Sequence, residues 1–148
     1  NNGKKAMGST LVGALFNNEK FIVFNVGDSR LYMFRGGYLA QKTRDHSLAE
    51  QVGGNVPKNY ITSCIGGGFD KITIDIYDLT GRVRENDLII LCSDGLTDID
   101  MDKHYDNVED IIKKNISDLQ KMNMELLSFS LENGSSDNVS VVSVEILN

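Results

Sequence analysis

The chain has 148 residues, enough for a domain with a hydrophobic core, and its 41% hydrophobic and 24% charged residues are ordinary for a globular protein. The formal net charge of −6 argues against nucleic acid or an anionic membrane as the main partner, because both select clustered lysine and arginine. No apolar run is long enough to span a bilayer, no signal peptide opens the chain, and Cys64 and Cys92 lack the spacing of a zinc site or a disulfide framework. A reducing, cytoplasmic setting is therefore expected, with neither nucleic acid nor membrane as a partner.

The first part of the chain is predicted to consist of β-strands joined by tight turns. Residues 1–7 are polar and are expected to be a frayed end or the stub of something longer. Strands are predicted over residues 9–16, 20–26, 31–34 and 38–42. The first two should form a hairpin, and residues 20–26 are apolar on both faces and therefore belong in the centre of a sheet. Because the connections are so short, the four strands are predicted to form one antiparallel meander.

The middle of the chain changes character. Residues 43–69 contain two glycine clusters and the only proline, Pro57, which predicts loops with a short helix over residues 48–52. Residues 72–78 then alternate, with three isoleucines on one face, and this pattern predicts a strand with one wet face.

The second half begins with a buried strand and continues with helices. Residues 88–92 are uniformly apolar and are bounded by polar residues, which indicates a buried strand. Helices are predicted over residues 107–115 and 117–133, with Asp118 in the first turn of the second and Gly134 at its end. A final strand is predicted over residues 139–146. No linker or repeat interrupts the chain, so residues 1–148 are predicted to form a single domain.

Three aspartates stand beside the ends of predicted strands. Asp28 and Asp94 follow strands, and Asp137 precedes one. If these strand ends share an edge, the carboxylates converge, and such a cluster is costly unless a cation binds among them. Oxygen ligands without a histidine or cysteine cluster select Mg²⁺ or Mn²⁺ over zinc, and such a site can activate water and hold a phosphoryl group. The alternative is three independent turn aspartates, and spacing alone leaves both interpretations open.

Two other routes to phosphate chemistry are not supported by the sequence. A cysteine phosphatase needs an arginine six residues after its thiolate, whereas Asp70 and Asp98 stand at those positions after Cys64 and Cys92. A phosphate-binding P-loop fails as well, because no Gly-Lys-Ser or Gly-Lys-Thr follows a predicted strand.

Five short motifs occur in a fixed order along the chain. They are Gly8-Ser9-Thr10, Asn25-Val26-Gly27-Asp28-Ser29-Arg30, Asp45-His46-Ser47, Leu91-Cys92-Ser93-Asp94-Gly95-Leu96-Thr97-Asp98 and Gly134-Ser135-Ser136-Asp137-Asn138-Val139. In this order they make the chain resemble the carboxyl-terminal portion of a metal-dependent protein serine/threonine phosphatase of the PPM, or type 2C, family. The resemblance implies an α+β fold, an αββα sandwich of two antiparallel sheets flanked by helix pairs, present here only in its carboxyl-terminal part.

The resemblance also implies an activity and a set of metal ligands. Members of the family hydrolyse phosphoserine and phosphothreonine on proteins with a metal-activated water and no covalent enzyme intermediate. Asp94 and Asp137 match the aspartates that bind a pair of Mg²⁺ or Mn²⁺ ions, and Asp28 matches the one associated with a third, weaker metal. No catalytic residue beyond these metal ligands is implied.

Neighbouring residues are implied to support the ligands. Ser93, Gly95, Asn138 and Arg30 would surround and orient the metal-binding aspartates. Arg30 has an alternative, structural role, which is to pair with Asp28 or another carboxylate. The pair Asp45-His46 is expected to fix the loop that follows the fourth strand.

One part of the family pattern has no counterpart. The amino-terminal third of the family carries an Asp-Gly-His-Gly-Gly type motif whose aspartate bridges both metals, and no Asp-Gly-X-Gly-Gly occurs in the 148 residues. The chain is therefore expected to be a partial phosphatase domain, incompletely active alone, whose partners are a phosphorylated protein and the missing amino-terminal part of the same protein. The alternative is a non-catalytic phosphatase-fold module that binds or regulates a partner protein.

Overall fold

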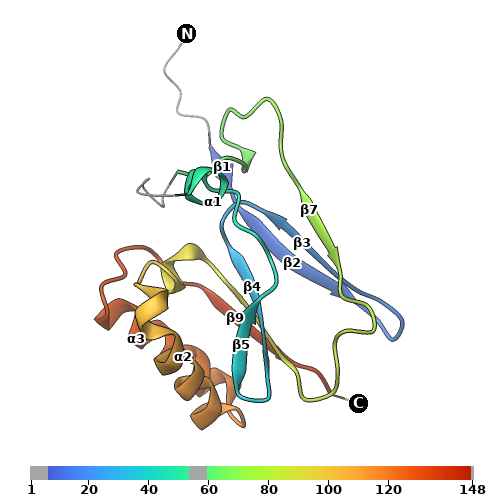
Figure 1. Ribbon diagram of the computed structural model, residues 1–148, viewed down its shortest axis with the longest axis vertical. Coiled ribbons are helices and arrows are strands. Elements are labelled where there is room, and N and C mark those ends of the chain that lie inside the picture. Colours follow the sequence, from blue (N-terminus) through green and yellow to red (C-terminus); the bar gives the residue numbers. More distant parts are fainter. Residues whose placement is uncertain (1–6, 54–59, 148) are drawn as a thin grey trace. The chain divides into compact units, whose positions relative to one another are not determined.

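The computed structural model describes residues 7–53 and 60–147, so the frayed end predicted for residues 1–7 lies almost wholly outside it. Figure 1 shows the helices and strands of the chain, which divides into two compact units. The first unit comprises Asn1–Arg30 and Thr43–Arg82, and the second comprises Leu31–Lys42 and Val83–Asn148. That residues 1–148 form a single domain stays a prediction.

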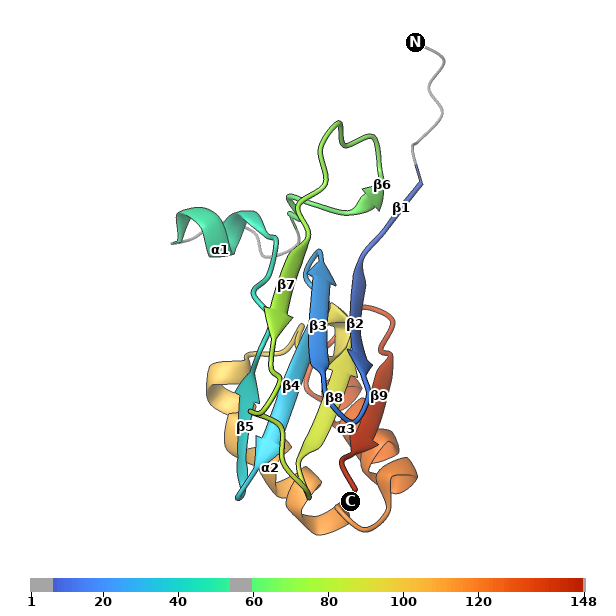
Figure 2. The same cartoon turned by 90° about the vertical axis from the view of Figure 1, so that its right-hand side faces the viewer.

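The first unit is built on a three-stranded sheet in the order β2-β3-β7 (Figure 2). Strands β2 (Leu11–Phe16) and β3 (Phe21–Val26) form the predicted antiparallel hairpin. Its turn is closed by Asn17, whose Oδ1 accepts the backbone N–H groups of Glu19 and Lys20 at 2.9 and 2.8 Å. Strand β7 (Asp75–Asp78) pairs antiparallel with the other side of β3, which confirms that β3 is central.

One face of this sheet is apolar and exposed. Ile74 and Ile76 are 59% and 70% exposed, while Asp75 and Tyr77 on the opposite face are half-buried. The alternation in residues 72–78 therefore correctly indicated a strand with two different faces. The face that carries the isoleucines is the exposed one. The strand itself begins only at Asp75. On the same face the ring of Phe24 lies against Gly13 of the neighbouring strand, where an added Cβ would collide with it.

Smaller elements complete the first unit. A short ladder joins β1 (Gly8–Ser9) to β6 (Ile65–Gly66) in antiparallel pairing. Helix α1 (Leu48–Val52) confirms the short helix predicted there. It is capped at its start by Ser47, whose hydroxyl oxygen accepts the backbone N–H of Glu50 at 3.2 Å.

The second unit is built on a four-stranded sheet in the order β5-β4-β8-β9. Its strands are β4 (Arg30–Arg35), β5 (Tyr38–Gln41), β8 (Leu88–Cys92) and β9 (Val141–Glu145). The predicted single meander is wrong, because β2 and β3 belong to one sheet and β4 and β5 to another. The chain leaves the first sheet at Gly27, whose φ of 106° suits glycine and breaks the run of extended residues.

Helices α2 (Met101–Asn115) and α3 (Leu119–Glu132) lie together on one side of this sheet (Figure 1). Between helices and sheet lies one buried apolar cluster, made of Tyr32, Phe34, Leu39, Leu88, Ile90, Cys92, Leu96, Val108, Ile112, Met122 and Leu126. Asp118 caps α3 as predicted, with Oδ1 accepting the N–H of Lys121 at 3.0 Å, whereas α2 begins earlier than predicted. The antiparallel strand pairs and the helix pair confirm the α+β class.

Other features of the chain follow from these elements. Both cysteines are buried and neither is in a disulfide, and Cys92 packs in the apolar cluster as the sequence predicts. Across the described residues, no helix is both long and apolar enough to cross a membrane.

Candidate functional site

Asp94 stands where the buried strand β8 ends. The chain passes from Cys92 through Ser93 into a single 3₁₀ turn, η1 (Asp94–Leu96). Two bonds fix this turn, because the backbone N–H and the hydroxyl of Thr97 donate to the Asp94 carbonyl at 2.7 and 3.1 Å. The backbone that carries the Asp94 carboxylate is therefore fixed at the end of strand β8, as the sequence predicts.

Asp137 lies in the loop that leads into β9, and this loop packs directly on the turn that follows β8. The hydroxyl of Ser93 donates to the Asn138 carbonyl at 3.1 Å and accepts the backbone N–H of Ser140 at 3.0 Å. Gly95 lies so close to the Asn138 carbonyl oxygen that an added Cβ would collide with it. The structure thus brings Ser93, Gly95 and Asn138 together around the predicted ligands.

The two aspartates act on one another electrostatically. Burial, followed by the negative charges of Asp137 and Asp98, raises the pKa of Asp94 above its usual range. A cation among these carboxylates would relieve the repulsion, and carboxylate oxygens are the ligands that Mg²⁺ and Mn²⁺ prefer. The donor set therefore fits such an ion, although over residues 7–53 and 60–147 the side chains form no group of three or more metal ligands.

Asp28 belongs to the first unit. It is 8% exposed and lies in the bend between β3 and β4. The bend is held to Thr10, the residue that precedes β2, because the hydroxyls of Ser29 and Thr10 share a hydrogen bond of 2.8 Å and a Cβ on Gly27 would collide with the Thr10 side chain. The structure gives Asp28 a rigid backbone within its own unit.

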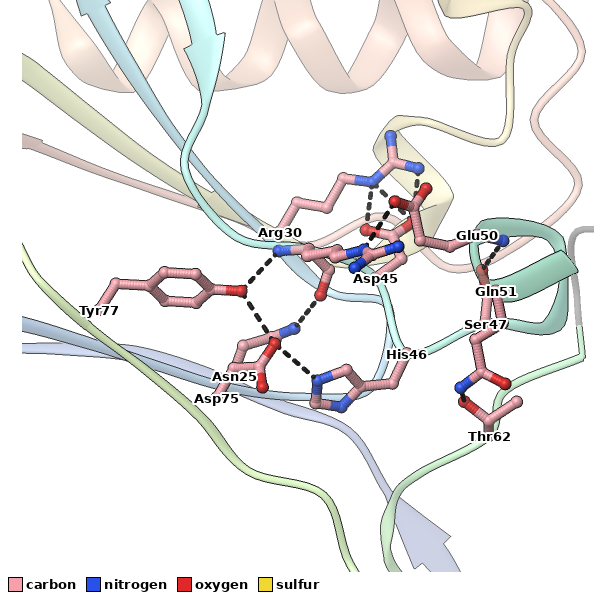
Figure 3. Close-up of polar contacts among 11 residues, drawn as sticks. Asn25, Arg30, Asp45, His46, Ser47, Glu50, Gln51, Thr62, Asp75 and Tyr77 are labelled. Carbon is pink, nitrogen blue, oxygen red and sulfur yellow. Dashed lines mark hydrogen bonds and ion pairs between the residues drawn. The ribbon is translucent and has the colours of Figure 1, made fainter. Parts of the chain in front are cut away.

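Charged and polar contacts of Arg30, Asp45 and His46 also hold this bend (Figure 3). Arg30 binds Asp45 with two nitrogens, Nε at 3.0 Å and Nη2 at 2.7 Å, which is a pairing of the kind that its alternative role describes. Its part in orienting Asp28 stays a prediction. The N–H of Gly27 donates to Nδ1 of His46 at 3.1 Å, which places the imidazole proton on Nε2, 3.2 Å from Asp75 Oδ2. Asp45 and His46 therefore fix this loop, in agreement with the role expected for them.

Further members of this network were not predicted from the sequence. The hydroxyl of Tyr77 donates to Asp75 at 3.0 Å and accepts the Arg44 N–H at 2.9 Å, and burial is the main cause of its raised pKa. Asn25 is fully buried and donates to the carbonyls of Gly27 and Arg44 at 3.1 and 3.0 Å. A single polar residue inside the apolar run of β3 is the sequence signal that could have identified it.

Two serines beside the second-unit aspartates were also missed. Ser130 and Ser135 are buried, and both hydroxyls donate to the carbonyl oxygen of Gly95, at 2.8 and 2.7 Å. They lie 35 and 40 residues from Gly95 in sequence, so no local pattern predicts these bonds.

Comparisons with known proteins agree with this fold. The family model for protein phosphatase 2C matches residues 1–52. The serine/threonine phosphatase stp of Listeria welshimeri is 31% identical over 94% of this chain and 57% of its own length. Protein phosphatase 2C homolog 1 of Saccharomyces cerevisiae is 32% identical over 86% of this chain and 50% of its own length.

Solved structures give the same result. PppA, a key regulatory component of T6SS in Pseudomonas aeruginosa, superimposes with a TM-score of 0.79 at 30% identity, over 95% of this chain and 59% of PppA. The catalytic domain of the serine/threonine protein phosphatase PstP in complex with two manganese ions gives a TM-score of 0.73 at 25% identity, over 95% of this chain and 60% of that solved domain.

The chain therefore belongs to the PPM, or type 2C, family of protein phosphatases. The chain spans about half the length of the curated relatives it matches, 57% of stp and 50% of the yeast homolog.

Proposed function

We propose that the chain is part of a phosphatase that hydrolyses phosphoserine and phosphothreonine on proteins with Mg²⁺ or Mn²⁺. The observation that carries this proposal is the packing of the Asp137 loop on the turn of Asp94, which leaves two interacting carboxylates at the end of a buried strand. The names of the relatives support it, since stp and PstP are serine/threonine phosphatases and PstP has been solved with two manganese ions.

Each predicted residue has a part in this proposal. Asp94 and Asp137 would hold a pair of ions, and Asp28 a third, weaker one. When bound, the ions would lower the pKa of a coordinated water and withdraw negative charge from the phosphoryl group. No other side chain is proposed to take part in the chemical step.

The surrounding residues would orient the ligands. The hydroxyl of Ser93 joins the end of β8 to the residues that precede β9. Gly95 has no side chain, so the Asn138 carbonyl can pack directly against it. Arg30 would act on the bend of Asp28 through its ion pair with Asp45. These contacts hold carboxylates in place before any ion arrives, which reduces the cost of assembling the site.

The expected partners follow from the activity. The substrate would be a phosphorylated protein, and a cytoplasmic setting fits the two free cysteines. No Asp-Gly-X-Gly-Gly motif occurs in the chain, so a further part of the same protein would complete the metal shell. The chain alone should therefore bind Mn²⁺ weakly and hydrolyse phosphate esters slowly.

Hydrolysis of p-nitrophenyl phosphate with and without Mn²⁺ tests the proposal, on this chain and on the natural full-length protein. We expect Mn²⁺-dependent hydrolysis by the full-length protein and its loss in Asp94→Asn, because the amide cannot replace an anionic ligand. Asp118→Asn is the matched control, since Asp118 caps α3 and should leave hydrolysis unchanged. If the full-length protein shows no hydrolysis with either ion, the phosphatase proposal is wrong and the alternative, a phosphatase-fold module that binds a partner protein, is favoured.

A further inference from the structure

Two buried hydroxyl groups converge on one backbone carbonyl beside the candidate metal ligands. Ser130, on α3, is 0% exposed and its hydroxyl donates to the Gly95 oxygen at 2.8 Å. Ser135, in the loop that follows α3, donates to the same oxygen at 2.7 Å. A carbonyl oxygen has two lone pairs, so these two donors saturate it.

This arrangement links three segments at one point. Gly95 directly follows Asp94, and Ser135 stands two residues before Asp137. The backbone N–H of Ser135 also donates to the Ser130 carbonyl at 3.1 Å, which ties the loop to the end of α3. The turn of Asp94, the loop of Asp137 and the helix are therefore joined through the Gly95 oxygen.

We propose that Ser130 and Ser135 are positioning residues that set the spacing between Asp94 and Asp137 for a divalent cation. The inference rests on the proposed function and deepens it. Two carboxylates can bind the same ion only if the distance between them is fixed. Hydrogen bonds that orient metal ligands commonly control the affinity for the metal. The serines touch neither ion nor substrate, and they act through the backbone on either side of the ligands.

A purely structural role makes a different prediction. A buried carbonyl needs hydrogen-bond donors whatever stands next to it, so losing a hydroxyl would lower the stability of the fold. A structural role gives no reason for a change in Mn²⁺ affinity at an unchanged fold. Metal affinity and thermal stability, measured on the same variants, therefore separate the two roles.

The test is a titration of the ¹⁵N-labelled natural full-length protein with MnCl₂. The paramagnetic broadening of the amide signals of residues 94–98 and 135–138 is followed, because it also detects weak binding. The variants are Ser130→Ala and Ser135→Ala, with Ser135→Thr to restore the hydroxyl. Ser143→Ala is the matched control, because the Ser143 hydroxyl also joins a strand to α3, through Asn123 at 2.5 Å, but lies away from the two aspartates in the chain. Each variant is also melted in EDTA.

We expect both alanine variants to need about tenfold or more Mn²⁺ for half-broadening. Ser135→Thr and Ser143→Ala should broaden at the parent concentration. If the alanine variants melt at lower temperature but broaden at the parent concentration, the serines are structural and the inference is overturned. If the parent protein shows no broadening at residues 94–98 or 135–138, the metal site of the proposed function is wrong. In that case the inference about the two serines is wrong as well.

Discussion

The two turns that carry candidate metal ligands are held by different kinds of interaction. In the first unit, the bend of Asp28 is fixed by polar contacts, chiefly the ion pair of Arg30 with Asp45 and the bond from Gly27 to His46. In the second unit, the turn of Asp94 ends a strand that is buried under two helices and an apolar cluster. A carboxylate can therefore be positioned either by a charged network or by uncharged hydrogen bonds at the end of a core strand, and the two should respond differently to mutation.

The largest expected effect comes from the core of the second unit. Ile112 is 0% exposed and belongs to the apolar cluster, so Ile112→Ala should lower the free energy of unfolding by about 2–5 kcal/mol. Urea unfolding measures this loss. Met124→Ala, on the exposed side of α3, is the control and should change the free energy of unfolding by about 0.5 kcal/mol or less. Equal losses in the two variants would contradict the account of the core.

A smaller effect is expected from the ion pair between Arg35 and the buried carboxylate of Asp87. Asp87 is 1% exposed and accepts bonds from Arg35 at 2.5 and 2.6 Å and from the Arg84 N–H at 2.7 Å. Asp87→Asn should cost about 1.5–3 kcal/mol at neutral pH, because the amide no longer matches these donors. Urea unfolding at pH 7 checks the size of the loss.

The pH dependence sharpens this prediction. Burial alone would raise the pKa of Asp87, but the bonds from Arg35 and Arg84 outweigh it and the pKa is lowered. A carboxyl group whose pKa is lower in the folded state than in the unfolded state stabilises the fold when the pH is above its unfolded-state pKa, about 3.9. This stabilisation is lost as the pH falls through the folded-state pKa. The difference between parent and Asp87→Asn should therefore shrink below about pH 4, and a constant difference down to pH 2 would be inconsistent with the ion pair.

The smallest expected effect comes from the charged network of the first unit. Asp45→Asn should lower the free energy of unfolding by about 1 kcal/mol, because it breaks the half-buried pair with Arg30. Glu50→Gln, which breaks the exposed pair with Arg44, is the control and should cost about 0.5 kcal/mol or less. Chemical shifts at residues 27–30 should move in Asp45→Asn and stay unchanged in Glu50→Gln. Similar shifts in both variants would show that the pair does not hold the bend.

Local patterns in the sequence predicted the elements better than their arrangement. Strand β8 and the hairpin of β2 and β3 follow from apolar runs and turn residues, and both are observed as predicted. The single meander was wrong because short spacing indicates which strands are close in sequence, not which sheet each joins. Alternation in residues 72–78 likewise distinguishes two faces of a strand but not which face is buried, since burial depends on what packs against it.

The candidate site shows the same limit. Asp94 and Asp137 could be identified because each lies beside an apolar strand, and the structure brings their two segments into contact. Ser130 could not be identified, because a serine within a helical stripe has no pattern that reveals a bond to a carbonyl 35 residues away. Helix α2 was predicted too short because its first turns carry charged residues and few apolar ones.

The most direct test of the central claim is anomalous diffraction at the manganese edge from crystals grown with MnCl₂. The account predicts a manganese peak at coordination distance from both the Asp94 and the Asp137 carboxylates in the parent protein, and its loss in Asp94→Asn. A peak elsewhere, or none at these two carboxylates under conditions that support Mn²⁺-dependent hydrolysis, would contradict the claim that the turn after β8 and the loop before β9 form the metal site.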